Sequence, residues 1–140
     1  MEMKRLFLPL IACIACLLLS ACASRNFTGL WIAPDSEKAL FELDLVRKGD
    51  RVEGYHSAIL SGGNQIDSVL RSDNAAPSIM GTVVDGGARV QFEVRNRAGG
   101  GEAFMKLVSG KKMVWTRIST SGGQTLPETC ILIRQPQPKH

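Results

Sequence analysis

The chain is poor in the residues that build metal and acid–base sites. Its 140 residues include two histidines, one tyrosine and four cysteines. His56 is the only histidine before the C-terminal His140, so the three or four ligands of an ordinary zinc site are not available. The sequence also has no Gly-x-Ser-x-Gly segment, and the predicted domain has no histidine other than His56 to activate a serine. We therefore expect no catalytic residues, no enzymatic activity, no metal and no cofactor.

The sequence likewise lacks a strong charge bias. Lysine and arginine number 17 against 13 aspartate and glutamate residues, a formal charge of +4. A nucleic-acid-binding surface usually needs a clustered basic stripe. We expect no nucleic-acid partner, and a chain of this length has room for one domain only.

Long apolar runs are confined to the start of the chain. Lys4 and Arg5 precede the apolar run Leu6–Leu19, which is too short to span a bilayer by itself. A basic segment followed by such a run is typical of a secretory signal. We interpret residues 1–21 as a signal peptide.

The end of this run carries a second signal. Leu19-Ser20-Ala21-Cys22 resembles the lipobox of bacterial lipoproteins, in which the cysteine receives the lipid. The resemblance implies lipidation of Cys22, a short tether over residues 22–26, and anchoring by acyl chains. The residue after the cysteine is Ala23 and not aspartate. By the same resemblance this implies the outer membrane, with the protein facing the periplasm.

These assignments account for the cysteines. Cys13 and Cys16 fall in the removed segment, so Cys130 is the one remaining free thiol. No intramolecular disulfide is then available in an oxidising compartment. Cys130 lies in an apolar run, and we expect a buried small side chain there in preference to a reactive thiol.

The rest of the chain shows the two-residue alternation of β-strands. Residues 88–95 alternate apolar and polar side chains in strict turn, and Asp85-Gly86-Gly87 before them is typical of a hairpin. The same reasoning predicts about eight short strands, with 129–134 as a candidate ninth: 27–32, 39–47, 51–59, 65–70, 78–84, 88–95, 102–108 and 112–118. A helix over 36–47 is the main competing interpretation. Gly99-Gly100-Gly101 is predicted as a flexible hairpin loop.

This pattern predicts an all-β fold. An open sheet of so many strands would leave exposed edges, so closure is favoured. We predict a single, small, antiparallel up-and-down β-barrel over 27–134, followed by a disordered polar tail over 135–140.

Three short segments resemble avidin-type barrels. The first is Phe27-Thr28-Gly29-Leu30-Trp31, of which lipocalins share the shorter Gly-x-Trp. The others are Gly54-Tyr55-His56-Ser57 and Met113-Val114-Trp115. Ala33 stands where the asparagine of the biotin clamp would be, so biotin binding is not expected. Small periplasmic inhibitors of secreted metalloproteases also use such a barrel, which implies a protein partner.

Two loops rich in glycine and small polar residues are candidate partner-binding segments, because recognition usually sits on loops of a rigid scaffold. They cover 61–67 and 119–127. The residues singled out are Ser61, Gly62, Gly63, Asn64, Gln65, Ser121, Gly122, Gly123 and Gln124. We predict a non-enzymatic protein-binding module, an inhibitor or immunity protein against a periplasmic hydrolase or toxin.

The alternative is a lipocalin-like carrier of a small apolar ligand. Trp31, Tyr55, Met105 and Trp115 would line its cavity. Against this, so short a chain needs most of its apolar side chains for a core. His56 is expected to be a barrel residue with a local hydrogen-bond partner. Glu42 and Asp44 are expected on a solvated strand face.

Basic side chains form one further candidate group. Arg95, Arg97, Lys111 and Lys112 are expected at barrel loops, as a soluble rim or as a contact for anionic lipid headgroups or an acidic partner.

Overall fold

A computed structural model describes residues 26–34, 39–60, 65–94, 99–122 and 126–137. The predicted signal peptide and Cys22 lie outside the described residues. The described chain forms strands joined by turns and one three-residue 3-10 helix: β1 (Gly29–Ile32), β2 (Ala39–Lys48), β3 (Arg51–Leu60), β4 (Gln65–Val69), η2 (Arg71–Asp73), β5 (Ile79–Val84), β6 (Gly87–Val94), β7 (Gly99–Leu107), β8 (Lys112–Ser121) and β9 (Thr129–Arg134). No helix among these residues is long and apolar enough to cross a membrane.

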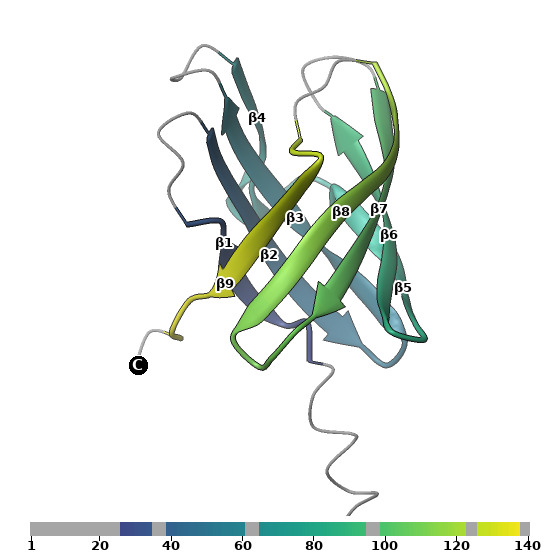
Figure 1. Cartoon of the computed structure of the whole chain (residues 1–140). Coiled ribbons are helices and arrows are strands. Elements are labelled where there is room, and N and C mark those ends of the chain that lie inside the picture. Colours follow the sequence, from purple (N-terminus) through teal and green to yellow (C-terminus); the bar gives the residue numbers. More distant parts are fainter. Residues whose placement is uncertain (1–25, 35–38, 61–64, 95–98, 123–125, 138–140) are drawn as a thin grey trace, which may run out of the picture.

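Eight of the strands close into an antiparallel barrel (Figure 1). The hydrogen-bonded order is β2-β1-β9-β8-β7-β6-β5-β3, and β2 pairs with β3 to complete the ring. Neighbours in this ring are consecutive along the chain except at two places: β1 pairs with β9 to close the ring, and β4 intervenes in the sequence between β3 and β5. The predicted all-β, up-and-down barrel is therefore confirmed. The segment 36–47, for which a helix was the competing interpretation, contributes β2 and no helix among its described residues.

The remaining strand, β4, does not take a place in the ring. It shares one edge of β3 with β5: Leu60 to His56 pair with β4, and Gly54 to Arg51 pair with β5. The opposite edge of β3 is paired along its whole length with β2. β4 and β5 thus act as the two halves of one interrupted strand, and residues 70–78 form an insertion between them.

The barrel interior is packed with large side chains. Trp115 contacts Phe41 edge-on, with ring centroids 5.2 Å apart, and Phe92 at 5.9 Å. Its indole nitrogen donates a hydrogen bond to the Pro127 carbonyl oxygen at 3.0 Å. Trp31, Trp115, Met105 and many other core residues have no exposed surface at all. Edge-on aromatic pairs contribute about 0.5–1.5 kcal/mol beyond their buried area.

The barrel is closed where β1 meets β9, and this seam is short. Among the described residues, two pairs join the strands, Trp31 with Arg134 and Ile32 with Ile133, and the Gln135 N–H donates to the Leu30 carbonyl oxygen at 2.8 Å just beyond them. The Arg134 guanidinium lies over the Trp31 ring, 4.5 Å from its centroid, and also donates to the Asn26 carbonyl oxygen. The Trp31 indole nitrogen donates to the Phe27 carbonyl oxygen at 2.9 Å. The stacking of Arg134 and its hydrogen bond to the backbone therefore reinforce a seam in which few residues of the two strands are paired.

The triple glycine corrects one prediction. Gly99–Gly101 is not a hairpin loop but the start of β7, paired with β6 and β8. A β-carbon at Gly101 would lie 2.1 Å from the Ser119 carbonyl oxygen, and one at Gly100 would lie 2.3 Å from the Phe92 carbonyl oxygen. Only glycine permits such close approach of neighbouring strands. Glycine composition alone favoured a loop because it does not reveal strand spacing.

Gly54 provides a test of the barrel geometry. A β-carbon there would lie 2.2 Å from the Asp44 carbonyl oxygen in the neighbouring β2. We expect Gly54→Ala to lower the free energy of unfolding by about 2 kcal/mol or more, as overpacking does. Gly110→Ala, which meets nothing within 4 Å, is the matched control and should change it little. Urea unfolding followed by tryptophan fluorescence measures both, and equal stability of the two variants would contradict the structure.

Candidate functional site

The connections between strands differ at the two ends of the barrel (Figure 1). At the end where the described chain begins, three pairs of strands are joined by short links: β2–β3, β5–β6 and β7–β8. At the opposite end lie the strand ends flanking residues 33–38, 61–64, 95–98 and 122–128. The link from β4 to β5 is the insertion on the barrel wall.

The residues predicted to bind a partner belong to the second end. Ser61, Gly62, Gly63 and Asn64 lie outside the described residues, as do Gly123 and Gln124. Gln65 is the first residue of β4, Ser121 is the last of β8, and Gly122 follows it with a φ of 82°. The described strand ends that flank the two predicted segments therefore lie at the same end of the barrel.

The four residues predicted to line an internal cavity separate into two groups. Trp31, Met105 and Trp115 are fully buried in the core. Tyr55 points the other way, onto the outer wall, because its neighbours Gly54 and His56 face inward. The structure therefore does not bring the four side chains together.

The basic residues predicted to gather at barrel loops are also divided. Lys111 and Lys112 lie at the β7–β8 turn, at the end where the described chain begins. Arg95 and Arg97 lie outside the described residues, between strand ends at the opposite end of the barrel.

Cys130 is partly buried against the core. Burial disfavours the thiolate and raises the pKa of the thiol to about 12. A thiol with this pKa is almost entirely protonated at neutral pH. The environment fits the small apolar side chain expected from the sequence.

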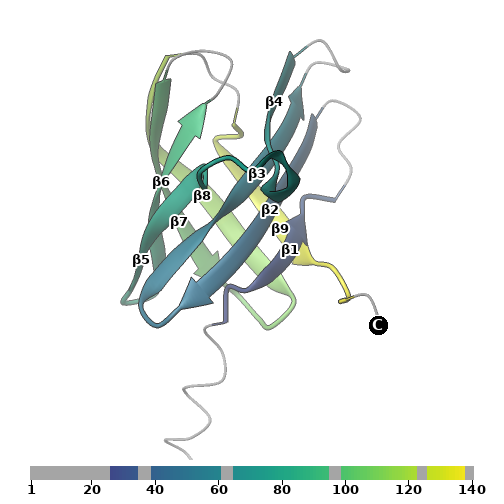
Figure 2. The same cartoon turned by 180° about the vertical axis from the view of Figure 1, so that it is seen from behind.

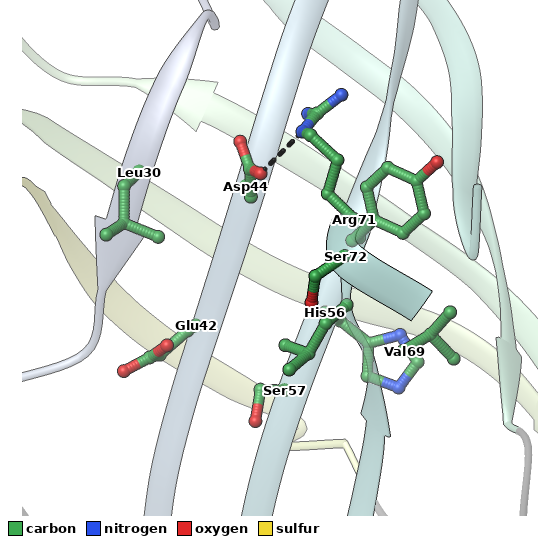
Figure 3. Close-up of a pocket in the computed structure, with 10 residues that line it drawn as sticks. Leu30, Glu42, Asp44, His56, Ser57, Val69, Arg71 and Ser72 are labelled. Atoms are coloured by element: carbon green, nitrogen blue, oxygen red, sulfur yellow. Dashed lines mark hydrogen bonds and ion pairs between the residues drawn. The ribbon is translucent and has the colours of Figure 1, made fainter. Parts of the chain in front are cut away.

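The outer wall of the barrel carries a pocket of ≈ 520 Å³ (Figure 3). Its lining comes from β1, from β2 and β3, mostly at their outward positions, and from the end of β4 with the insertion that follows it. The lining residues are Leu30, Glu42, Asp44, Tyr55, His56, Ser57, Val69, Leu70, Arg71 and Ser72. Its volume falls within the range of small-molecule sites.

The insertion forms one side of this pocket. Figure 2 shows its short helix, η2, over the outer surface of β2 and β3. The turn is closed by the Leu70 backbone N–H, which donates to the Asp73 carboxylate at 2.8 Å. It ends at Asn74, whose φ of 51° is the left-handed conformation that asparagine tolerates. We call residues 70–74 the strap.

Two side chains fasten the strap to the wall. The Arg71 guanidinium donates to the Asp44 carboxylate at 2.8 Å and lies over the Tyr55 ring, 4.9 Å from its centroid. The Tyr55 hydroxyl donates to the Ala75 carbonyl oxygen at 3.1 Å. The hydrogen bond and charge of Asp44 raise the pKa of Arg71. Asp44 is thus paired, and not simply solvated as expected from its strand face.

Glu42 differs from Asp44. It is partly buried at the adjacent outward position of β2, beside Leu30 in Figure 3. Among the described residues, no hydrogen bond or ion pair engages its carboxylate. The pocket therefore combines apolar walls, one carboxylate paired with arginine and one without a cation.

A buried polar group lies behind the pocket, inside the barrel wall. His56 Nδ1 lies 2.8 Å from Ser78 Oγ, and its Nε2 lies 3.4 Å from the Asp67 carboxylate. Ser78 Oγ also accepts the His56 backbone N–H at 3.2 Å. All three residues are at least 96% buried. The group joins β3, β4 and the residue before β5.

An imidazole between a carboxylate and a hydroxyl is the arrangement that activates nucleophilic serines. Here Ser78 has only 4% of its surface exposed, and its hydroxyl oxygen already accepts a hydrogen bond from the His56 backbone N–H. A nucleophile must reach its substrate, so this geometry fits a buried connection that holds the insertion in register. Within the described chain, no group of three or more His, Cys, Asp or Glu residues could hold a metal ion.

Sequence reasoning gave His56 a local partner but identified neither Asp67 nor Ser78. The available signal was the alternation of β4, which places Asp67 on the same inward face as Val69. An inward carboxylate needs a buried partner, and His56 was the obvious one. Ser78 had no comparable signal, because only the pairing of β3 with both β4 and β5 brings it to His56.

Comparison of the chain with protein-family models, with curated proteins and with solved structures gave no match.

Ser78→Ala tests the buried polar group. The change leaves His56 Nδ1 and the His56 backbone N–H without their hydroxyl partner, which costs about 1–3 kcal/mol of stability. Ser72→Ala, at an exposed strap position, is the control and should be within about 0.5 kcal/mol of the wild type. Urea unfolding measures the difference. If the two variants unfold at the same urea concentration, the hydroxyl does not hold the insertion.

Proposed function

We propose that the protein is a lipoprotein anchored in the bacterial outer membrane through Cys22, facing the periplasm, and that it binds a protein partner without catalysing a reaction. The partner class is a periplasmic hydrolase or a toxin that acts there, so the module serves as an inhibitor or immunity protein. The observation that carries this proposal is the division of the barrel into two ends.

The tether would enter at the end with the short turns. The described chain begins just before β1, whose first residue, Gly29, pairs with Leu45 near the β2–β3 turn at this end. With only residues 22–26 between the lipid and the barrel, this end would face the membrane. The connections at the far end, including the two predicted partner segments, would point away from it. Loops on a rigid scaffold at the far end are suited to block a partner's active site.

The packed interior supports a surface binder over a carrier. The side chains of Trp31, Met105 and Trp115 have no exposed surface, neither toward solvent nor toward an internal cavity. A carrier would need a hollow beside these side chains. The enclosed position of Ser78 likewise supports a non-enzymatic role.

Metabolic labelling with an alkyne fatty acid tests the anchor. We expect the wild-type protein to incorporate the label and Cys22→Ala to incorporate none, because the thiol is the site of alkylation. Cys130→Ser is the matched control and should be labelled like the wild type. Label on the Cys22→Ala protein would contradict the anchor.

Native mass spectrometry of the protein, released gently from its own envelope, tests the partner. We expect a retained mass of tens of kilodaltons, lost on deletion of 122–124 and reduced by Asn64→Ala. Lys111→Ala at the opposite end is the control and should retain the mass. Thermal unfolding must be unchanged in the two loop variants. A retained mass of a few hundred daltons, or loss of fold together with loss of the partner, would contradict the proposal.

A further inference from the structure

The outer-wall pocket is separate from the loop end and from the barrel interior, so the proposed partner-binding role does not use it. It has walls of exposed apolar side chains: Leu30 retains 39% of its surface and Leu70 retains 46%. Large apolar side chains exposed around one concave site are a common mark of ligand binding. The occupant should therefore carry an apolar part.

The charged side chains of the pocket indicate what the polar part of the occupant should be. Asp44, Glu42 and Arg71 are its charged lining residues, with His56 facing the barrel interior behind them. Arg71 neutralises Asp44 through the 2.8 Å hydrogen bond. Glu42, two residues away on the same strand face, has no cationic partner among the described residues. A carboxylate partly withdrawn from water favours a cation that can also donate hydrogen bonds.

The pocket already stabilises one guanidinium. Arg71 is held between the Asp44 carboxylate and the Tyr55 ring face, which combines an ion pair with a cation–π contact. Glu42 and Leu30 offer the corresponding carboxylate and apolar surface on the other side of the pocket (Figure 3). The chemistry that suits a bound cation is therefore present twice, and among the described residues Arg71 is the one cation of the pocket lining.

We propose that this pocket binds a small organic cation, a guanidinium or ammonium group on a short apolar stem, with Glu42 as its counter-ion and Leu30 and Leu70 against the stem. A free small molecule fits better than a side chain of a docked protein. The strap lies over the wall on one side of the pocket, where a protein surface would have to approach.

The test uses the full-length protein, purified in a neutral detergent and labelled with ¹⁵N. Butylguanidinium is the probe, and butylurea is its uncharged analogue of nearly the same shape. We expect butylguanidinium to shift the amide signals of Glu42, Asp44 and Leu70 saturably. Because a charged hydrogen-bond partner is lost, butylurea should bind the wild-type protein about ten-fold more weakly.

Glu42→Gln removes the charge and keeps the side-chain size. We expect it to weaken butylguanidinium binding by about ten-fold and to leave butylurea binding unchanged. Glu128→Gln, at an exposed position before β9, is the matched control and should bind both probes like the wild type. Thermal unfolding of the two variants should agree, which separates a binding effect from a loss of fold.

Three results would overturn the proposal. The first is equal affinity of the wild type for the two probes. The second is the absence of saturable shifts at the pocket with butylguanidinium. The third is markedly tighter binding of N-acetylarginine methylamide than of butylguanidinium, because the occupant would then be an arginine side chain of another protein. Loss of the periplasmic partner in the experiments above would leave these titrations unchanged, so the two proposals fail independently.

Discussion

The fold depends on the contact between Trp31 and Arg134. Among the described residues, the barrel closes through two residue pairs between β1 and β9. Arg134 compensates by stacking on the buried indole and by donating to the backbone of Asn26, before β1. Burial lowers the pKa of Arg134, yet this side chain joins the two ends of the described chain. An arginine that binds an aromatic face and a carbonyl together can hold a seam that strand pairing alone would leave weak.

The second determining feature is the division of one edge of β3 between β4 and β5. It forces the residues between Val69 and Ser78 off the sheet, with the strap on the outer wall. The same interruption has one structural consequence on each face of β3. Inside, it places Ser78 and Asp67 beside His56. Outside, it places Arg71 over Asp44 and Tyr55. The buried polar group and the pocket are therefore consequences of one departure from a simple meander.

The two proposed roles occupy different surfaces for a physical reason. The interior is packed with fully buried side chains, so both proposals place binding on the wall or at an end. The ends are set by topology, which places alternate connections at opposite ends of the barrel. The wall pocket is set by the strap. A protein partner at the loop end and a small cation on the wall can thus be recognised by one rigid domain without competing.

The sequence by itself determined the strands and their inward faces. The alternation in β6 and the turn after Val84 are local patterns with a period of two, and they need no knowledge of distant residues. Tertiary structure decided the rest. Gly99–Gly101 is strand because of the spacing to β6 and β8. Glu42, Leu30 and Leu70 share a pocket, and His56 meets Ser78, through pairings between distant segments. Strand register across the barrel fixes such contacts, and no local pattern encodes it.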